Sequence, residues 1–508
     1  MAFGNEIRTG SSGQSTGFYN GVVSTSARFR TADASSLTLT QNTNDPSDST
    51  KGTLSFWLKR SNISASPSNN VHYLFVTSSG TDDDGWKALG IANDDELFLA
   101  DYNGAPIANN AGRLYRDPTA WMHIAVVWDT TSGTASARAP KLYINGLRDT
   151  ADTYSDTPAQ NEKWSYTNRN QEISIGRSNF SGSSTNYFDG YLADVHVLDG
   201  VAVGETSSVL DEFIERKNGI CIPKSYSGSY GNNGFRLQFK QTGTSANSSG
   251  IGADTKPSGT LYHFTVNNFS DHDSNLPDCP ENNFASLNNL FYSPFSASNS
   301  YAQGNLQGGT SSTGGGNVVG TMAIPSEGKW YYEFRSTTIG AGINLGLWAL
   351  DVSQDFFYKV TPSIAYLSTA NKRVNNSTSS YGASWNSSNT IGVAVDIDSG
   401  TVTFYVDNSS QGAISFDATG LLPVFGDNTG GSGCTGIINF GQDSTFAGTI
   451  SAGNNADANG IGDFAYAPPS NHLALCSSNL PEPTIGPNSD ILTGDLHTSV
   501  VYTGTGSS

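Results

Sequence analysis

Two clusters of acidic residues are the first places in this chain where carboxylates could do chemistry. Asp82–Asp84 and Asp94–Glu96 lie close together in the sequence. Hydrolysis of a glycosidic bond needs two carboxylates about 5–10 Å apart. Residues 86–92 between the clusters have the pattern of a strand, which would be roughly 20 Å long at about 3.3 Å per residue. The predicted hairpin puts the clusters at opposite ends, so they do not form one catalytic pair.

Each acidic cluster is then either a calcium site at a loop rim or a solvated turn. Calcium takes about six to eight oxygen ligands, many of them carboxylates, and Asp82, Asp83 and Asp84 can supply several. The chain lacks the spaced Asp-x-Asp-x-Asp-Gly pattern of a calcium loop. A turn is the favoured interpretation, and calcium at Asp82–Asp84 is the alternative. No other cofactor is predicted.

Other catalytic and metal-binding patterns are absent from the sequence. The seven histidines show no His-Glu-x-x-His or His-x-His spacing, and His123 lies in an apolar run where a packed imidazole is expected. The four cysteines lack Cys-x-x-Cys spacing, which argues against a zinc site or a disulfide framework. The glycine-rich segment 308–316 lacks the lysine of a phosphate-binding loop. We therefore predict that the protein is not an enzyme.

Aromatic side chains in or near loops are the remaining candidates, because sugars are held by aromatic faces beside polar groups. Aromatic residues of a β-sandwich belong more often to the core, and core packing is the alternative interpretation for each of them. The candidates are Trp86, Tyr102, Trp164, Tyr166 and Tyr187 in the first half of the chain and Tyr358, Tyr381 and Trp385 in the second half.

The elements that position these residues are predicted to be short strands. Apolar or alternating runs such as Leu54–Leu58, His123–Trp128 and Lys141–Ile144 are separated by Asn, Asp and Gly turns, which is typical of an antiparallel sandwich. Asn145-Gly146 predicts a tight hairpin, because both residues tolerate positive φ. One short helix is predicted over Ser207–Lys217, with its apolar residues on one face.

Composition supports an all-β protein and excludes several classes of function. Only 14% of the 508 residues are charged, while glycine supplies 56 positions, so the exposed Lys and Glu of a helical protein are missing. The 26 basic and 45 acidic residues give a net charge of −19, which argues against nucleic-acid binding. The sequence shows neither a signal peptide nor an apolar run that could span a membrane. We expect it to be made in a reducing cytoplasm.

The first half of the chain resembles a laminin-G-like, concanavalin-type jelly roll. The resemblance is carried by four segments in the order of that fold: Thr53–Lys59, Trp121–Asp129, Lys141–Gly146 and Phe188–Val195. The second half resembles a SPRY-type sandwich through Gly328–Phe334, Ile391–Tyr405 and Leu421–Phe425. The succession of modules resembles fibre or lectin-like structural proteins of tailed bacteriophages.

The predicted fold is all-β, with two antiparallel β-sandwich (jelly-roll, concanavalin-like) domains joined by an irregular connector. Residues 1–25 form an extended N-terminal arm, 26–240 the jelly roll, 241–320 the connector rich in Gly, Ser and Asn, 321–480 the SPRY-like sandwich, and 481–508 a C-terminal extension that resembles the start of a further module.

The resemblance implies a non-enzymatic structural or adhesion protein of a tailed-phage virion: a tail fibre, a spike or a capsid-decorating fibre. Its partners would be other virion proteins, bound through the N-terminal arm, further copies of the chain, with a trimer as the family's common arrangement, and a glycan of the host surface. It would be carried on the virion surface after synthesis in the host cytoplasm. The alternative is a polysaccharide depolymerase or glucanase of the concanavalin-like fold.

Overall fold

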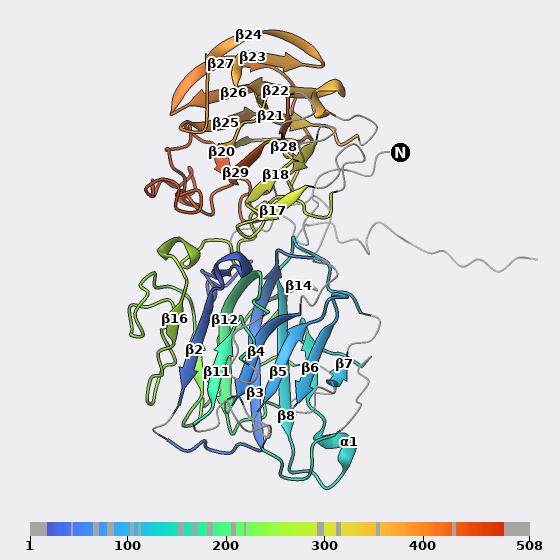
Figure 1. Cartoon of the computed structure of the whole chain (residues 1–508), viewed down its shortest axis with the longest axis vertical. Helices are drawn as coiled ribbons and strands as arrows, with labels where there is room; N and C mark the ends of the chain where they lie inside the picture. Colours follow the sequence, from blue (N-terminus) through green and yellow to red (C-terminus); the bar gives the residue numbers. More distant parts are fainter. Residues whose placement is uncertain are drawn as a thin grey trace, which may run out of the picture.

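The chain folds into two β-sandwiches, seen stacked along the long axis of the molecule in Figure 1. The predicted all-β class is confirmed, since α1 (Ala135–Arg138) is the only α-helix within the described residues. The computed structural model describes residues 18–41, 44–63, 71–78, 86–101, 106–109, 113–150, 157–163, 166, 170–179, 186–204, 210–217, 220–291, 299–310, 316–351, 356–428 and 433–481.

Two sheets face each other in the first sandwich, and all their strand pairs are antiparallel. The β3 sheet consists of β1 (Ala27–Phe29), β12 (Gly190–Asp199), β3 (Lys51–Arg60), β8 (Met122–Asp129), β9 (Lys141–Ile144) and β10 (Leu147–Arg148), with β15 (Phe235–Leu237) also paired to β12. The β4 sheet consists of β16 (Thr265–Asn267), β2 (Ser36–Thr40), β11 (Glu172–Ile175), β4 (His72–Ser78), β5 (Lys87–Ile91), β6 (Leu97–Asp101) and β7 (Pro106–Asn109).

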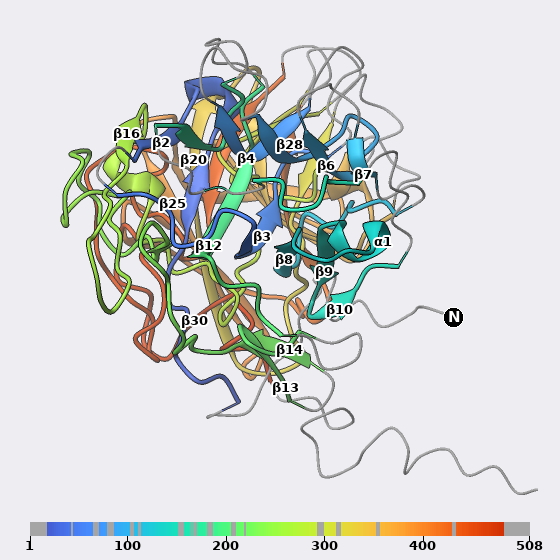
Figure 2. The ribbon, with the colours of Figure 1, turned by 90° about the horizontal axis from the view of Figure 1, so that it is seen from below.

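The β3 sheet is covered on both faces, which explains its long apolar runs. One face packs against the β4 sheet through residues such as Phe56 and Ile124. The other face lies under the hairpin of β13 (Ile214–Lys217) and β14 (Ile220–Pro223), which Figure 2 shows beyond the row of β12, β3, β8 and β9. His123 is fully buried on this second face, with its Nε2 2.8 Å from Ser55 Oγ. The predicted packed imidazole is confirmed.

The helix predicted over 207–217 is wrong for its described part. Ile214–Lys217 is strand β13, paired antiparallel with β14. The apolar residues that suggested a helix face, Leu210, Phe213 and Ile214, are all buried. They cover the outer face of the β3 sheet, and this packing together with the hairpin pairing overrides the helical spacing.

Two sheets also form the second sandwich, whose pairs are antiparallel except for the short parallel pair of β30 with β20. One sheet consists of β17 (Ser300–Ala302), β18 (Gln307–Gly309), β29 (Thr435–Asn439), β20 (Lys329–Thr338), β25 (Thr390–Asp396), β26 (Thr401–Val406), β27 (Ser409–Ser415) and β30 (Leu473–Ala474). The other consists of β19 (Asn317–Val319), β28 (Leu422–Asp427), β21 (Ile343–Trp348), β22 (Ser363–Leu367), β23 (Thr369–Val374) and β24 (Ser377–Ser384).

The segment predicted as an irregular connector is built into both sandwiches. Strand β16 pairs with β2, and Ile251 and Phe264 belong to the first core. Strands β17–β19 join the sheets of the second sandwich. Short strands of three residues, such as those of 300–319, leave little periodicity for a sequence pattern to show, so the prediction of a separate connector fails here.

The described end of the predicted N-terminal arm is packed against the rest of the chain. The Glu281 carboxylate accepts hydrogen bonds from the backbone N–H groups of Gly21, Val22 and Val23 at 2.7, 2.8 and 2.9 Å. Phe18 is buried, and Lys217 Nζ lies 4.9 Å from the centroid of its ring. Residues 18–25 are therefore not a free arm. Residues 1–17, and the predicted C-terminal extension beyond residue 481, lie outside the described residues.

Buried charges hold the two sandwiches together, and we call this group the domain seam: Arg28, Arg30, Lys59, Asp273, Asp278 and Asp443. Arg28 Nε lies 3.1 Å from Asp273 Oδ1, and its Nη2 lies 3.0 Å from Asp443 Oδ2 in the second sandwich. Burial opposes the charge of Arg28, but the two carboxylates outweigh it and raise the pKa of the guanidinium. Because an unpaired buried charge is costly, these pairs fix the relative placement of the sandwiches.

Candidate binding site

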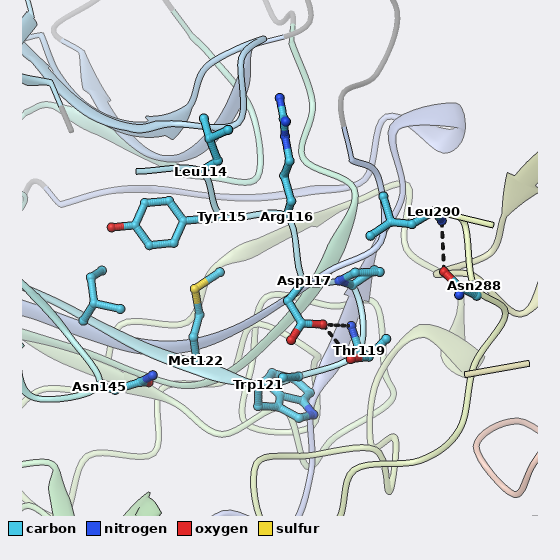
Figure 3. Close-up of a pocket in the computed structure, with 13 residues that line it drawn as sticks. Leu114, Tyr115, Arg116, Asp117, Thr119, Trp121, Met122, Asn145, Asn288 and Leu290 are labelled. Carbon is cyan, nitrogen blue, oxygen red and sulfur yellow. Dashed lines mark hydrogen bonds between the residues drawn. The ribbon is translucent and has the colours of Figure 1, made fainter. Parts of the chain in front are cut away.

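A surface cleft of about 670 Å³ lies at the edge of the β3 sheet, where β8 begins and β9 ends. Figure 3 shows its walls, which come from the turn before β8, from the β9 end and from the segment that leads into the second sandwich. The lining residues are Leu114, Tyr115, Arg116, Asp117, Pro118, Thr119, Ala120, Trp121, Met122, Ile144, Asn145, Asn288 and Leu290.

The turn that forms one wall is held by a buried ion pair. Asp95 Oδ1 lies 2.9 Å from Arg60 Nη2, and Asp95 Oδ2 accepts a hydrogen bond from Arg116 Nε at 2.6 Å. The backbone N–H of Tyr115 donates to the carbonyl of Asp95 at 3.0 Å. Asp95, which belongs to the second acidic cluster, therefore stabilises the cleft wall. This role differs from both predicted interpretations of the cluster, a calcium site and a solvated turn.

Trp121 is the aromatic residue at the base of the cleft, and its orientation is fixed from the domain seam. Its indole Nε1 donates to Asp278 Oδ1 at 3.0 Å, and the other oxygen of that carboxylate lies 2.8 Å from Lys59 Nζ. The ring also meets Tyr191 edge-on at a centroid distance of 6.3 Å. Trp121 stays half-buried, so part of its surface faces the cleft.

Apolar side chains on opposite walls are unusually open to water. Leu114 is 48% exposed and Leu290 is 53% exposed, and both line the cleft. Met122 and Ile144, which line the same cleft, are half-buried. Exposed leucines that line one concave surface mark a candidate binding site. A ligand that covers them removes apolar area from water, and this lowers the free energy of the complex.

Two asparagines present polar groups of fixed orientation. Asn145 Oδ1 accepts a hydrogen bond from the backbone N–H of His123 at 2.8 Å, and Asn288 Oδ1 accepts one from the N–H of Leu290 at 3.1 Å. No described residue accepts a hydrogen bond from either Nδ2 group. Each amide therefore has its oxygen occupied and its N–H groups left to donate. The side chain of Arg116, by contrast, points away from Trp121 in Figure 3.

The aromatic residues predicted to bind glycans lie elsewhere. Trp86, Tyr166, Tyr358 and Trp385 are only 6%, 0%, 6% and 4% exposed, so their faces are packed in cores and not open to a sugar. All four lie in or near loops as predicted, but their burial favours the core alternative. Tyr187 and Tyr381 are half-buried, and neither lines the cleft. Tyr102 and Trp164 lie outside the described residues.

The calcium prediction at Asp82–Asp84 also lies outside the described residues and stays a prediction. Elsewhere in the described part of the chain, no three His, Cys, Asp or Glu residues are grouped so that they could hold a metal ion. The four cysteines are free thiols, as their spacing predicted. No helix in the described ranges is long and apolar enough to cross a membrane.

Sequence reasoning missed the cleft because its walls come from distant segments. Tyr115–Thr119 could have been noticed as an aromatic and polar turn directly before a strand. Asp117 Oδ1 accepts from both the N–H and the Oγ1 of Thr119, at 2.8 and 2.6 Å, which is a recognisable turn signature. Asn288 and Leu290, however, fall in the segment predicted to be a connector, and nothing local in the sequence places them beside β8.

A second cleft, of about 630 Å³, lies at the domain seam, and its polar groups serve the fold. Asp443 is held by Arg28 and by Thr445 Oγ1, and Asp463 accepts from Ser444 Oγ at 2.7 Å. Burial raises the pKa of Asp463, and the Arg28 charge lowers the pKa of Asp443 against the effect of burial. Among its described lining residues there is no Phe, Tyr or Trp. The cleft beside Trp121 is therefore the better candidate for recognising a ligand.

Comparison with known domain families supports the two-sandwich description. Residues 31–206 match the family described as the concanavalin A-like lectin/glucanases superfamily, and residues 329–443 match the SPRY domain. The chain carries a concanavalin-like domain followed by a SPRY domain. The cleft residues from Leu114 to Asn145 fall within the first match, whereas Asn288 and Leu290 lie between the two.

Solved structures with local similarity include a human SPRY domain at 18% identity and a TM-score of 0.23, covering 26% of this chain and 91% of that one. A putative carbohydrate-binding protein from Bacteroides ovatus has 14% identity and a TM-score of 0.31, covering 48% of this chain and 58% of that one. The stonustoxin structure has 14% identity and a TM-score of 0.25, covering 30% of this chain and only 27% of that one. No curated protein sequence matches the chain.

Proposed function

We propose that this protein is a non-enzymatic, lectin-like binding protein and that the cleft beside Trp121 holds a glycan. The observation that carries the proposal is the combination of a half-buried indole, fixed by Asp278, with oriented amide donors on the same concave surface. A sugar ring offers an apolar face and a belt of polar groups, so it can cover both kinds of surface at once. The match of the first domain to a superfamily of lectins and glucanases supports the same choice.

The cleft favours binding over hydrolysis. Glycoside hydrolysis uses two carboxylates that flank the scissile bond. Asp117 is the one carboxylate among the described residues that line this cleft, and its Oδ1 is occupied by Thr119. The described part of the lining offers no second carboxylate to pair with Asp117, and this supports a non-enzymatic role.

The test is a glycan array probed with the full-length protein, followed by calorimetry on the glycans that bind. We expect Trp121→Ala to weaken binding about tenfold or more, which corresponds to about 1.4 kcal/mol. Tyr187→Ala is the matched control, because Tyr187 is a half-buried aromatic residue outside the cleft. It should leave the affinity unchanged. Equal losses in both variants, or none in either, would contradict the assignment of the cleft.

The same incubations also test the enzymatic alternative. Reducing ends that accumulate in the presence of wild-type protein, and not with heat-denatured protein, would replace the lectin-like proposal with a glucanase or depolymerase. Unchanged glycan length together with saturable binding supports the lectin-like role.

We further propose that the protein acts in a tailed-phage virion, as an adhesion component of a tail fibre, spike or capsid decoration that touches a host-surface glycan. This placement rests on the sequence resemblance described above. Mass spectrometry of purified particles, with immunogold labelling for their location, tests it directly. Absence of the chain from particles would overturn it. Light scattering of the purified protein measures whether it forms the proposed homo-oligomer, with three chains as the expected number.

A further inference from the structure

The cleft combines an apolar floor with a hydrogen-bond donor of known direction. Met122 and Ile144 lie in neighbouring strands, since β8 pairs with β9, and Asn145 follows Ile144 directly. Asn145 Oδ1 is held by the N–H of His123, so its Nδ2 is the end of the amide that remains to donate. A ligand group seated here needs a methyl or methylene to cover the floor and an acceptor beside it.

An acceptor of fixed position lies on the other side of Met122. Figure 3 shows Asp117 and Asn145 on opposite sides of this residue. Asp117 Oδ1 receives both bonds from Thr119, and no described residue donates to its Oδ2. The carboxylate is exposed, so Oδ2 can accept a hydrogen bond from a ligand. Its counterpart in the ligand is an N–H or O–H group.

The guanidinium in the lining does not add a strong preference for anions. Arg116 Nε donates to Asp95 Oδ2, and Figure 3 shows the side chain directed away from the floor. Asp117, the carboxylate of the lining, repels anions. The recognised group is therefore not an anion, and it needs a methyl for the floor, an acceptor for Asn145 and a donor for Asp117.

We propose that the glycan in this cleft carries an N-acetyl group, an inference that rests on the proposed function and specifies its ligand. The acetyl methyl covers Met122 and Ile144, its carbonyl oxygen accepts from Asn145 Nδ2, and its N–H donates to Asp117 Oδ2. Leu114, which is 48% exposed, lines the same cleft on the Met122 side of Asp117 and adds apolar surface near the methyl, whereas Leu290, 53% exposed, lies beyond Asp117 in Figure 3. A plain hydroxyl at this position satisfies one polar group and leaves the apolar floor in contact with water.

The experiment uses matched saccharide pairs that differ only in an N-acetyl group against a hydroxyl on an otherwise identical ring, printed on one array and remeasured by calorimetry. We expect the N-acetylated member to bind at least tenfold more tightly. Equal binding of both members would overturn this inference and leave the proposed function standing. Binding of no saccharide at all would overturn both.

Two variants test the assignment residue by residue. Asn145→Asp keeps an oxygen to accept from His123 N–H and tolerates the positive φ of 48° at this position, but it loses the donor. It should reduce the preference for the N-acetylated member to about threefold or less. Leu114→Ser, at an exposed position, should weaken the N-acetylated ligand several-fold and leave its unacetylated partner unchanged. Leu261→Ser is its control, because Leu261 is 44% exposed and outside the cleft. An unchanged preference in both cleft variants would contradict the proposal.

Discussion

Trp121 in the cleft and the aromatic residues of the second sandwich differ in how much of their rings stays exposed to solvent. Trp121 is fixed at its indole nitrogen and is half-buried, so part of the ring is open. Trp385 lies between Phe334 and Tyr366 at centroid distances of 6.1 Å each and is 4% exposed. Tyr358 is covered by Arg373, whose guanidinium carbon is 3.8 Å from the ring centroid.

This difference shows why aromatic residues near loops are a poor guide to a binding site. In both regions neighbouring side chains pack against the rings. Each region also contains a ring whose polar atom donates a hydrogen bond: Trp121 donates to Asp278, and Tyr358 donates to the carbonyl of Asn428. A ring is available to a ligand only where part of its surface stays exposed. The cleft satisfies this condition, and the comparison predicts separable effects of mutation on stability and on binding.

The largest expected difference concerns stability. Trp385→Ala removes a fully packed ring from the second core and should lower the free energy of unfolding by about 3–5 kcal/mol. Trp121→Ala removes a half-buried ring and one hydrogen bond, and should cost about 1–2 kcal/mol. Guanidinium denaturation followed by circular dichroism measures both. Equal losses would mean that Trp121 is a core residue and would remove the basis of the comparison.

The two sandwiches also differ in how their buried ionisable groups respond to pH. In the first, burial and then the nearby His196 lower the pKa of His123 to about 3. In the second, burial raises the pKa of Glu333 to about 7, although its carboxylate accepts from the N–H groups of Ala465 and Tyr466 at 2.8 and 2.9 Å. Burial therefore favours the neutral form of both groups, which is the deprotonated imidazole for His123 and the protonated carboxyl for Glu333.

We therefore expect opposite responses between pH 7 and pH 5. The unfolded chain protonates His123 below about 6.5 while the folded chain does not, so stability from this group falls as the pH falls. The folded pKa of Glu333 lies above its ordinary value of 4.5, so its contribution is complete below that value and is lost as the pH rises toward 7. Each effect amounts to about 2 kcal/mol over this range.

Hydrogen exchange read by mass spectrometry separates the two responses, because peptides from β8 and β20 report on different sandwiches. On going from pH 7 to pH 5, protection corrected for intrinsic exchange should fall in β8 and rise in β20. Glu333→Gln is the control and should remove the rise in β20 without changing β8. A fall of equal size in both sandwiches would show that the domain seam couples them too strongly for separate responses.

Sequence could predict the parts of the fold that depend on local residue patterns. Asn145 and Gly146 do have positive φ, 48° and 72°, and join β9 to β10 as the hairpin signal indicated. The runs around 54–58 and 123–128 are strands of one sheet. The prediction of a helix over 207–217 was wrong because its apolar residues pack on the outer face of the β3 sheet. That face is formed by strands that are distant in the sequence, so local spacing could not show this packing.

The candidate site was beyond sequence patterns for a related reason. Asp95 looked like part of an acidic turn, yet it is 1% exposed and paired with Arg60, which is distant in sequence. Trp121 was recognisable as the first residue of a segment that resembles the concanavalin-type fold, but its open surface depends on where Asp278 and Leu290 lie. Local composition predicts which residues are polar or aromatic. It does not predict which of their surfaces remain uncovered after long-range packing.

Tyr381 separates a contribution to stability from a contribution to glycan binding. Tyr381 is half-buried at the far sheet of the second sandwich, and its hydroxyl donates to the carbonyl of Gly412 at 2.6 Å. Tyr381→Phe removes this bond and the long one that the hydroxyl accepts from the N–H of Phe404 at 3.4 Å, and it should cost about 1 kcal/mol of stability. Glycan affinity, measured by calorimetry, should not change, because the residue is outside the cleft. A loss of affinity without a loss of stability would assign the binding site to the second sandwich. A hydroxyl outside the cleft that does not affect stability can lower the affinity only through direct contact with the ligand.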